Sequence, residues 1–452
     1  MLNVIWLAML LVAVIVGGFS GRLDAMTKGA FDSAEVAVMK IALPLIGAWA
    51  IWLGMMRLAE RAGLVQSLAR GLRPIMRRLF PEVPADHPAM GAMVLNMAAN
   101  MLGLGNAATP LGLRAMALLQ KLNPHPAVAS NSMVTFLAVN TASIQLIPTT
   151  AISILAVQGS KNASIIVIPA IIATAIAMAC GIFLAKALSR LPAFRISGED
   201  SDVAENVAVA QENETAVEKI SPTPMSGAGR MLLAIFLAAF LAMFFALVWP
   251  AAANKLPESL AWQWRYRDFW PELGIGLRLL RAVSLLAIPF LLGFFPLVAW
   301  LRGVKVYEQF CEGAKEAFDT AKRVIPFLVA MLVAIGLLRD AGVMQMLTDA
   351  LRPMLDRIGF PSDLLPLALM RPLSGSASMG IFADLVKTHG ADSLIGRMAA
   401  TIYGSTETTF YVLAVYFGSV GIRKTRHAVI AGLAADFIAI ACAIAACHFL
   451  AR

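Results

Sequence analysis

The sequence has little charge for its length. Charged residues make up 14% of the 452 positions, whereas a soluble globular chain carries about 25%. Hydrophobic residues make up 59%, and the mean hydropathy is +0.75. This composition excludes an ordinary soluble domain. It indicates a protein that lies in a lipid bilayer, because several apolar windows reach the roughly 18 residues that a membrane span requires.

The net charge of +9 does not indicate a nucleic-acid partner. The basic residues stand mostly beside apolar stretches, as the cytoplasmic anchors of membrane spans do. Basic and aromatic residues alternate only within 262–270, a pattern typical of a belt at the membrane interface. The partner that the charge pattern predicts is therefore the lipid bilayer, with no nucleic acid.

Cysteine and histidine are also scarce, with four and five residues. No Cys-x-x-Cys or His-Glu-x-x-His spacing occurs, so the usual zinc motifs are missing. Cys442, Cys447 and His448 have the residue types of a metal site, but small buried residues on a terminal helix explain them better. The sequence predicts no metal, no cofactor and no catalytic residues, so we do not expect an enzyme.

Nine apolar stretches are predicted to cross the membrane. The first has no basic start and no clear cleavage site, so we interpret it as a retained span and not a signal peptide. Amphipathic stretches at 63–80 and 342–358 are predicted to be helices lying in the interface. Re-entrant helical hairpins are predicted over 90–120 and 364–387. The nine spans are 2–18, 36–56, 127–156, 165–188, 231–249, 279–301, 324–338, 394–418 and 428–450.

Four short polar islands interrupt the apolar sequence. Those at 103–110 and 371–380 are the predicted hairpin turns, and those at 140–143 and 405–408 break predicted spans. Where a helix unwinds within a bilayer, its freed backbone groups must find partners or line a cavity. We therefore predict that the islands form one substrate-binding site. Its candidate residues are Asn96, Asn100, Asn106, Thr109, Asn140, Thr141, Ser143, Gln145, Ser374, Ser376, Ser378, Ser405, Thr406, Glu407 and Thr408.

Glu407 is the most informative candidate, because an acid within a span is costly and is functional by default. We expect it to bind substrate hydroxyls, a cation or a proton. The alternative is a structural ion pair with Arg371 or Arg397. Asn106 and Ser376 are expected to approach one another near the midplane. The hairpin tips either present half-helix N-termini to a ligand or cap helices and allow close packing.

The two halves of the chain resemble one another. Ala62-Gly63 matches Ala341-Gly342, and Leu72-Arg73-Pro74 matches Leu351-Arg352-Pro353, both at an offset of 279. The first amphipathic stretch carries arginines without acids, whereas its counterpart carries arginine and aspartate equally. By the positive-inside rule the two stretches lie on opposite faces. The repeats are therefore predicted to be inverted, with a cytoplasmic N-terminus and an external C-terminus.

These features divide the chain into four parts. Residues 1–190 form the first repeat, 191–228 an acidic and disordered cytoplasmic linker, 229–302 connecting spans, and 303–452 the second repeat. The predicted fold class is an all-α polytopic membrane protein. It has two inverted repeats with re-entrant hairpins, about nine spans and interfacial amphipathic helices, which is the plan of secondary transporters.

The first repeat resembles spore maturation protein A, and the second resembles spore maturation protein B, so the chain is similar to a fused form of the two. Both belong to the nucleoside-recognition, or Gate, domain family. That domain also resembles parts of concentrative nucleoside transporters and of the membrane region of ferrous-iron transport protein B. No G-domain accompanies it here, so the resemblance does not favour iron transport. The residues that carry the resemblance are 96–110, 140–148, 371–380 and 402–410.

The resemblance implies nucleoside handling, and the broken helices imply a secondary transporter. The predicted function is transport of a small polar solute, a nucleoside or nucleobase, across the bacterial cytoplasmic (inner) membrane, with a coupling proton or cation. The first alternative is a non-transporting scaffold or partner protein in envelope or spore maturation, and a membrane enzyme comes third. The sequence leaves open whether the chain forms a homo-oligomer.

Overall fold

The regular secondary structure of the protein is helical. Among the described residues, one isolated bridge between Val128 and Lys424 is the exception. The prediction of an all-α fold is therefore confirmed. Most of the acidic linker and all of 262–270 lie outside the described residues. The computed structural model describes residues 2–103, 105–142, 144–194, 224–249, 274–357 and 359–451.

The same order of elements occurs twice. A long helix precedes an amphipathic helix, a hairpin, a broken helix and a final long helix. In the first repeat these are α1 (Leu2–Phe19), α2 (Leu23–Glu35), the π-helix η1 (Val36–Ala42), α3 (Leu43–Arg61), α4 (Leu64–Leu79), α5 (Pro88–Met101), α6 (Gly105–Lys121), α7 (Asn131–Thr141), α8 (Thr149–Val157), η2 (Ala163–Ile166), α9 (Val167–Leu188) and η3 (Pro192–Phe194). After the connecting helices α10 (Gly227–Val248) and α13 (Ile275–Leu301), the second repeat comprises α14 (Val306–Asp340), α15 (Val343–Arg357), η6 (Ser362–Leu364), α16 (Leu365–Met370), α17 (Gly375–His389), α18 (Leu394–Ser405), α19 (Thr409–Gly418) and α20 (Ala428–Ala451).

The predicted spans correspond to helices of the structure. Two of them are interrupted as expected, at the α7–α8 and α18–α19 breaks. The first is the shorter apolar helix Trp6–Phe19. The other six are continuous helices long and apolar enough to cross a bilayer: Leu23–Arg61, Ala163–Leu188, Gly227–Val248, Ile275–Leu301, Val306–Asp340 and Ala428–Leu450.

The hairpin turns are tighter than the polar islands suggested. Helix α5 ends at Met101 and α6 begins at Gly105, so helix already occupies most of the island at 103–110. Gly103 adopts a φ of 77°, a left-handed conformation that glycine tolerates and that ends a helix abruptly. The small residues that follow can then enter a new helix at once. Between α16 and α17 the turn likewise spans only 371–374.

The long helices α3 and α14 pack along one another and run antiparallel. Near one end of the pair, Gly313 lies against the Leu53 carbonyl and the Gly54 backbone. At the other end, Gly336 of α14 lies against Ser33 of α2. Low residue numbers of one helix thus meet high numbers of the other. Glycines at the crossing points bring the two backbones together, because they present no side chain between the helices.

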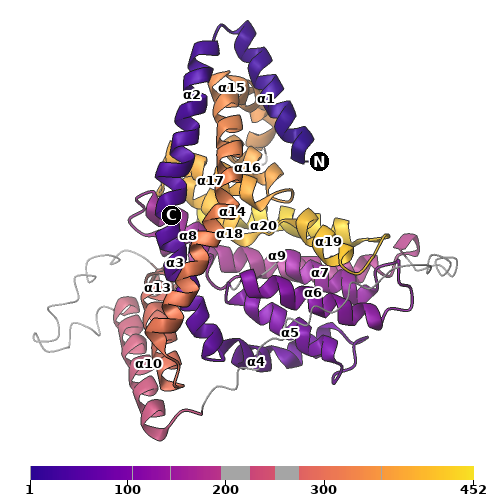
Figure 1. Ribbon diagram of the computed structural model, residues 1–452, viewed down its shortest axis with the longest axis vertical. Coiled ribbons are helices and arrows are strands. Elements are labelled where there is room, and N and C mark those ends of the chain that lie inside the picture. The colour runs from indigo at the N-terminus through magenta and orange to yellow at the C-terminus, as the bar shows by residue number, and fades with distance from the viewer. Residues whose placement is uncertain are drawn as a thin grey trace, which may run out of the picture.

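The amphipathic helices lie at opposite ends of this antiparallel pair. Figure 1 shows α4 at the lower end of α3 and α15 at the upper end of α14. Contacts between loops also place equivalent parts of the two repeats at opposite ends. At the α4 end, Ala129 N donates to Lys424 O at 3.0 Å, and at the α15 end Ser160 Oγ donates to Asp392 Oδ1 at 2.7 Å. Each contact joins the loop after a hairpin to the loop after a broken helix of the other repeat. The repeats are therefore inverted, as predicted.

Two large clusters of buried residues form the core. One surrounds the first hairpin and includes Met93 and Met116, and the other surrounds the second and includes Phe382 and Met398. Ile147, in the break between α7 and α8, packs against both clusters. The interrupted helices therefore lie where the cores of the two repeats meet, which is where the candidate site is built.

Candidate functional site

At the end of α7 and directly after α18 stands a threonine that bonds to its own preceding turn. Thr141 Oγ1 donates to Leu137 O at 3.0 Å, and Thr406 Oγ1 donates to Ile402 O at 2.7 Å. Such bonds to the i−4 carbonyl compete with the helix ladder and bend or end helices. The two threonines occupy equivalent positions in the repeats, so the same local chemistry interrupts both helices.

The two breaks meet each other. Gln145 Nε2, from the first repeat, donates to Glu407 Oε1, from the second, at 3.0 Å. A methyl group placed on Gly404 would lie 2.6 Å from Pro148 Cβ, so glycine is needed for the end of α18 to approach the start of α8. Gly432 of α20 similarly makes room for a threonine from each break. A Cβ at this position would lie 2.8 Å from Thr409 Cγ2 and 3.5 Å from Thr141 Cγ2.

Each hairpin turn lies against the break of its own repeat. Leu146 N donates to Met101 O at 3.0 Å, and Phe410 N donates to Pro372 O at 3.1 Å. These equivalent bonds use a carbonyl at a hairpin turn to satisfy an amide freed by an interrupted helix. The four islands therefore form one continuous row, from the first turn through both breaks to the second turn.

A cluster of amides lies beside the first break. Asn100 Nδ2 donates to Asn140 Oδ1 at 3.0 Å, and Asn140 Nδ2 donates to Phe136 O at 2.9 Å. Asn96 is fully buried and donates to Ala108 O at 2.8 Å, within the hairpin. Tyr416 of α19 reaches into this cluster, with its hydroxyl 3.4 Å from Asn140 Oδ1. The cluster thus links the first repeat to the broken helix of the second.

Arg371 supports the second break. Its side chain is only 4% exposed, and Nε donates to Thr406 Oγ1 at 2.9 Å. Nη2 donates to Tyr403 O at 3.0 Å and also to Thr406 O, and the guanidinium lies 4.6 Å from the centre of the Tyr403 ring. Among the described residues, no ion pair joins Glu407 to Arg371 or Arg397. The guanidinium of Arg371 instead donates hydrogen bonds to carbonyl groups that have no helical partner at the end of α18.

The remaining candidates occupy helix ends. Ser374 caps α17 by accepting from Ala377 N at 3.2 Å, and Ser378 Oγ donates to Ser374 O at 2.7 Å. Ser405 Oγ donates to Ile402 O at 3.4 Å. Thr408 is buried and precedes α19, where no side-chain capping bond forms. Thr109 and Ser376 lie near the starts of α6 and α17. The side chain of Asn106 and the whole of Ser143 lie outside the described residues, and with them the expected approach of Asn106 to Ser376.

Asp436 was missed by the sequence prediction. It is 2% exposed in α20, and its Oδ2 accepts from Thr409 Oγ1 at 2.5 Å. A signal was present in the sequence: 173–180 and 435–442 read Ala-Thr-Ala-Ile-Ala-Met-Ala-Cys and Ala-Asp-Phe-Ile-Ala-Ile-Ala-Cys. The alignment places Asp436 opposite Thr174, which would have marked a second acid within a predicted span.

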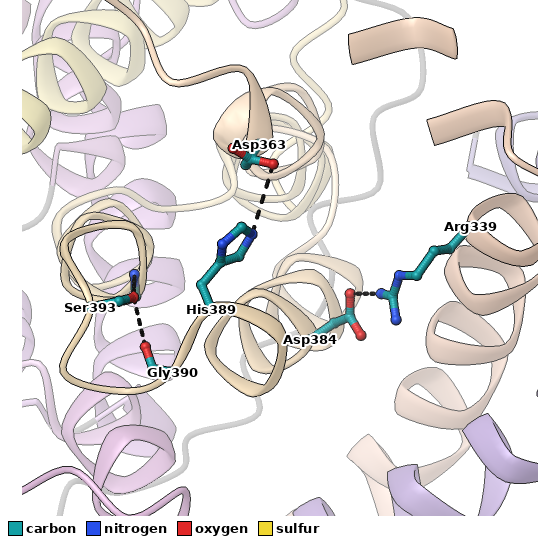
Figure 2. A network of polar contacts seen from close by, with 7 residues as sticks. Arg339, Asp363, Asp384, His389, Gly390 and Ser393 are labelled. Carbon is teal, nitrogen blue, oxygen red and sulfur yellow. Dashed lines mark hydrogen bonds and ion pairs between the residues drawn. The ribbon is translucent and has the colours of Figure 1, made fainter. Parts of the chain in front are cut away.

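A different polar network lies at the α15 end of the molecule. Figure 2 shows Arg339 contacting Asp384, and His389 facing Asp363, with His389 Nε2 3.8 Å from Asp363 Oδ1. Most of these side chains are partly exposed, so we assign the network to the solvated surface and not to the site. Within the described part of the chain, no group of three His, Cys, Asp or Glu side chains is arranged to hold a metal ion.

Asp392 ties the repeats together near that network. Its Oδ1 accepts from Ser160 Oγ at 2.7 Å and its Oδ2 from Lys161 N at 3.0 Å. Burial alone would raise the pKa of Asp392, but these hydrogen bonds and the charges of Arg397 and Lys161 outweigh it, so its pKa lies below the ordinary value. The carboxylate is therefore ionised at neutral pH and serves as a fixed link between the repeats.

The architecture defines a class of protein: a polytopic helical membrane protein built from two inverted repeats, each with a hairpin and a broken helix. The Gate family model, described as nucleoside recognition, matches residues 42–194 and 321–423, together more than half of the chain. The chain therefore belongs to the Gate family.

Two curated relatives come from Bacillus subtilis (strain 168). Spore maturation protein B is 45% identical over 162 residues, which cover 36% of this chain and 91% of that protein. Spore maturation protein A is 44% identical over 176 residues, which cover 39% of this chain and 89% of that protein. The resemblance deduced from the sequence is thus confirmed.

Proposed function

We propose that the protein is a secondary transporter of a small polar solute, and that the solute binds where the two broken helices meet. The observation that carries this proposal is the hydrogen bond between Gln145 and Glu407, which joins the breaks of the two inverted repeats. Discontinuous helices at the interface of inverted repeats are where secondary transporters bind their substrates. A site shared by two repeats changes its access when the repeats rock against one another.

The chemistry of the site favours a nucleoside or nucleobase. The Glu407 carboxylate accepts hydrogen bonds, as the hydroxyls of a sugar require. The amides of Gln145, Asn100 and Asn140 offer both donors and acceptors, which match the edge of a heterocyclic base. The family description as nucleoside recognition supports the same class. Substrate would replace the present bond between Gln145 and Glu407 with bonds of its own.

A second candidate function is a membrane scaffold or partner protein. The observation that favours it is that the island side chains largely satisfy one another: Asn100 with Asn140, Arg371 with Thr406, and Gln145 with Glu407. A vestigial site would keep these bonds for stability alone. The names of the two relatives refer to spore maturation and not to a solute.

We further propose that the chain lies in the cytoplasmic membrane with its N-terminus and the α4 end inside, and that a proton or cation accompanies transport. The support is the charge contrast between the ends. In intact cells, a labelling reagent should react with a cysteine placed at position 363 and spare one placed at position 86. Preferential labelling of position 86 would contradict this orientation. The α4 end carries Arg70, Arg73, Arg77, Arg78, Arg302, Arg423, Lys424 and Arg426 against the acids Glu60, Glu82 and Asp86, and the α15 end carries Asp349, Asp363, Asp384 and Asp392 beside Lys161, Arg339 and Arg357.

The test is uptake of radiolabelled uridine and adenosine into proteoliposomes, with the variant Glu407→Gln. Loss of a hydrogen-bonding charge should lower uptake by roughly tenfold or more, while the melting temperature stays near that of the parent chain. Glu308→Gln is the matched control, because Glu308 is exposed and pairs with Lys305. Full uptake by the Glu407 variant, or no saturable uptake by the parent chain, would favour the scaffold.

A further inference from the structure

The Asp436 carboxyl is buried in α20 without a charged partner. It is 2% exposed and lies within the apolar span Ala428–Leu450. Oδ2 accepts the hydroxyl of Thr409, whereas Oδ1 accepts no hydrogen bond from any residue that the structure describes. An ionised carboxylate that is buried with one donor and no base is strongly unfavourable. Uptake of a proton removes the charge.

The symmetry of the fold does not require an acid at this position. Its counterpart Thr174, in α9, is also buried and satisfies its own hydroxyl through Ala170 O at 2.9 Å and Ile171 O at 3.0 Å. A residue whose side chain hydrogen-bonds within its own helix can therefore occupy this buried position without an acid. The carboxyl is present in one repeat only, which points to a use beyond packing.

The surroundings of Asp436 are mostly apolar. Ala142, just after α7, and Ala177 of α9 belong to the same buried cluster as its neighbours Ala435 and Ala439. Arg371 and Glu407 act on it electrostatically, but among the described residues neither forms an ion pair with it. The other titratable side chains on the helices that pack against α20 are Cys180 and Lys186 of α9, Arg397 and Tyr403 of α18, and Tyr411 and Tyr416 of α19, whereas α7 carries none.

Thr409 connects this carboxyl to the proposed substrate site. It is the first residue of α19 and follows Glu407 and Thr408 directly. A hydroxyl forms a stronger hydrogen bond to an ionised carboxylate than to a neutral carboxylic acid, so the Thr409–Asp436 bond depends on the protonation state of the acid. With Asp436 ionised, this bond holds the N-terminal end of α19 against α20. Protonation of Asp436 is expected to weaken this bond and so to loosen the end of α19, with Glu407 beside it.

We propose that Asp436 binds the coupling proton, and that Thr409 transmits its protonation state to Glu407. In this step one proton from water adds to Oδ1, and the carboxylate becomes a neutral carboxylic acid. The inference rests on the proposed function, since coupling has meaning only in a transporter. It makes the buried acid of α20 the ion site and leaves Glu407 and Gln145 to the solute.

The first test needs no solute. Infrared difference spectra of the purified full chain in lipid, recorded across a pH series, should contain a protonated-carboxyl band that disappears as the pH rises. Asp436→Asn should lack this band, whereas Glu407→Gln should retain it. A band that persists in the Asp436 variant, or its absence from the parent chain, overturns the inference whatever the transport assays give.

The second test addresses the link through Thr409. Thr409→Val removes the donor that stabilises the charged carboxylate, so the infrared titration should shift to higher pH. Thr409→Ser keeps the donor and should restore the parent titration. Equal titrations in the Val and Ser variants would exclude this link. A helix-packing role alone would not distinguish the variants in this way.

The third test measures coupling with uridine in proteoliposomes. A pH gradient should drive accumulation of uridine by the parent chain, and Asp436→Asn should lose this accumulation, with uridine exchange becoming independent of pH. Accumulation driven by a sodium gradient and unaffected by pH would overturn the inference while preserving the proposed function. If no nucleoside is transported, the proposed function fails, and the infrared test still decides whether Asp436 binds a proton.

Discussion

Single buried polar residues fix the corners of this fold as well as its site. His427 lies immediately before α20 and is fully buried. Its Nε2 donates to Ala185 O at 2.8 Å, and its ring lies 5.5 Å from that of Phe194. Beside it, Arg426 adopts a positive φ of 53° and donates to Phe194 O and Asn131 Oδ1. The corner thereby joins the second repeat to the end of the first.

His427 should make this corner sensitive to acid. Burial lowers the pKa of His427, the charge of Arg426 acts in the same direction, and the bond to Ala185 opposes them. The folded chain therefore keeps the ring neutral, whereas the unfolded chain takes up a proton below about pH 6.5. Stability should fall as the pH drops from about 6.5 towards the folded-state pKa. Melting temperatures across this range should decline more steeply for the parent chain than for His427→Gln. Parallel declines would contradict the assignment.

The broken helices depend on side chains from neighbouring elements, and Arg371 is the clearest case. Arg371→Lys should destabilise the α18–α19 break, because one ammonium cannot reproduce the bonds of Nε and Nη2 to a hydroxyl and two carbonyls. We expect a loss of about 2 kcal/mol and, at 1.4 kcal/mol per factor of ten, roughly thirtyfold faster amide hydrogen exchange over 403–412. Arg339→Lys, at a partly exposed position, is the control. Unchanged exchange over 403–412 would show that the guanidinium does not hold the break.

Much of the fold followed from sequence patterns at the scale of elements. The breaks at 140–143 and 405–408 were predictable because hydroxyl and amide residues interrupt apolar runs, and the bonds of Thr141 and Thr406 to their own preceding turns favour a helix end there. The role of Arg371 was not predictable from the sequence. Its side chain could turn to Glu407 or to Thr406, and only tertiary packing decides between the two partners. Tyr416 was missed because an aromatic residue in an apolar helix gives no sign of the asparagines that it contacts.

The whole molecule is held together by contacts between the repeats. Helices α3 and α14 pack along one another, and so do α9 and α20. In both pairs the partners occupy equivalent places in the two repeats, so each repeat supplies the surface that the other needs. The two relatives in one organism each correspond to little more than a third of this chain. We therefore expect the contacts between the repeats, and not the linker, to hold the two halves together.

A chain divided within the linker, between residues 210 and 211, should therefore assemble from two separately expressed fragments. Each fragment alone would expose the apolar face that packs on its partner, so we expect a tag on one to recover both in equal amounts, and each to aggregate when made alone. Gly54→Leu in the first fragment should prevent recovery, because a Cβ there would lie 2.6 Å from the Phe310 ring and 2.9 Å from its carbonyl oxygen. Gly47→Leu is the matched control on the same helix, since a Cβ at that position meets no atom within 4 Å. Recovery of both fragments with Gly54→Leu, or stable and monodisperse single fragments, would show that the two repeats are independent domains and not one unit.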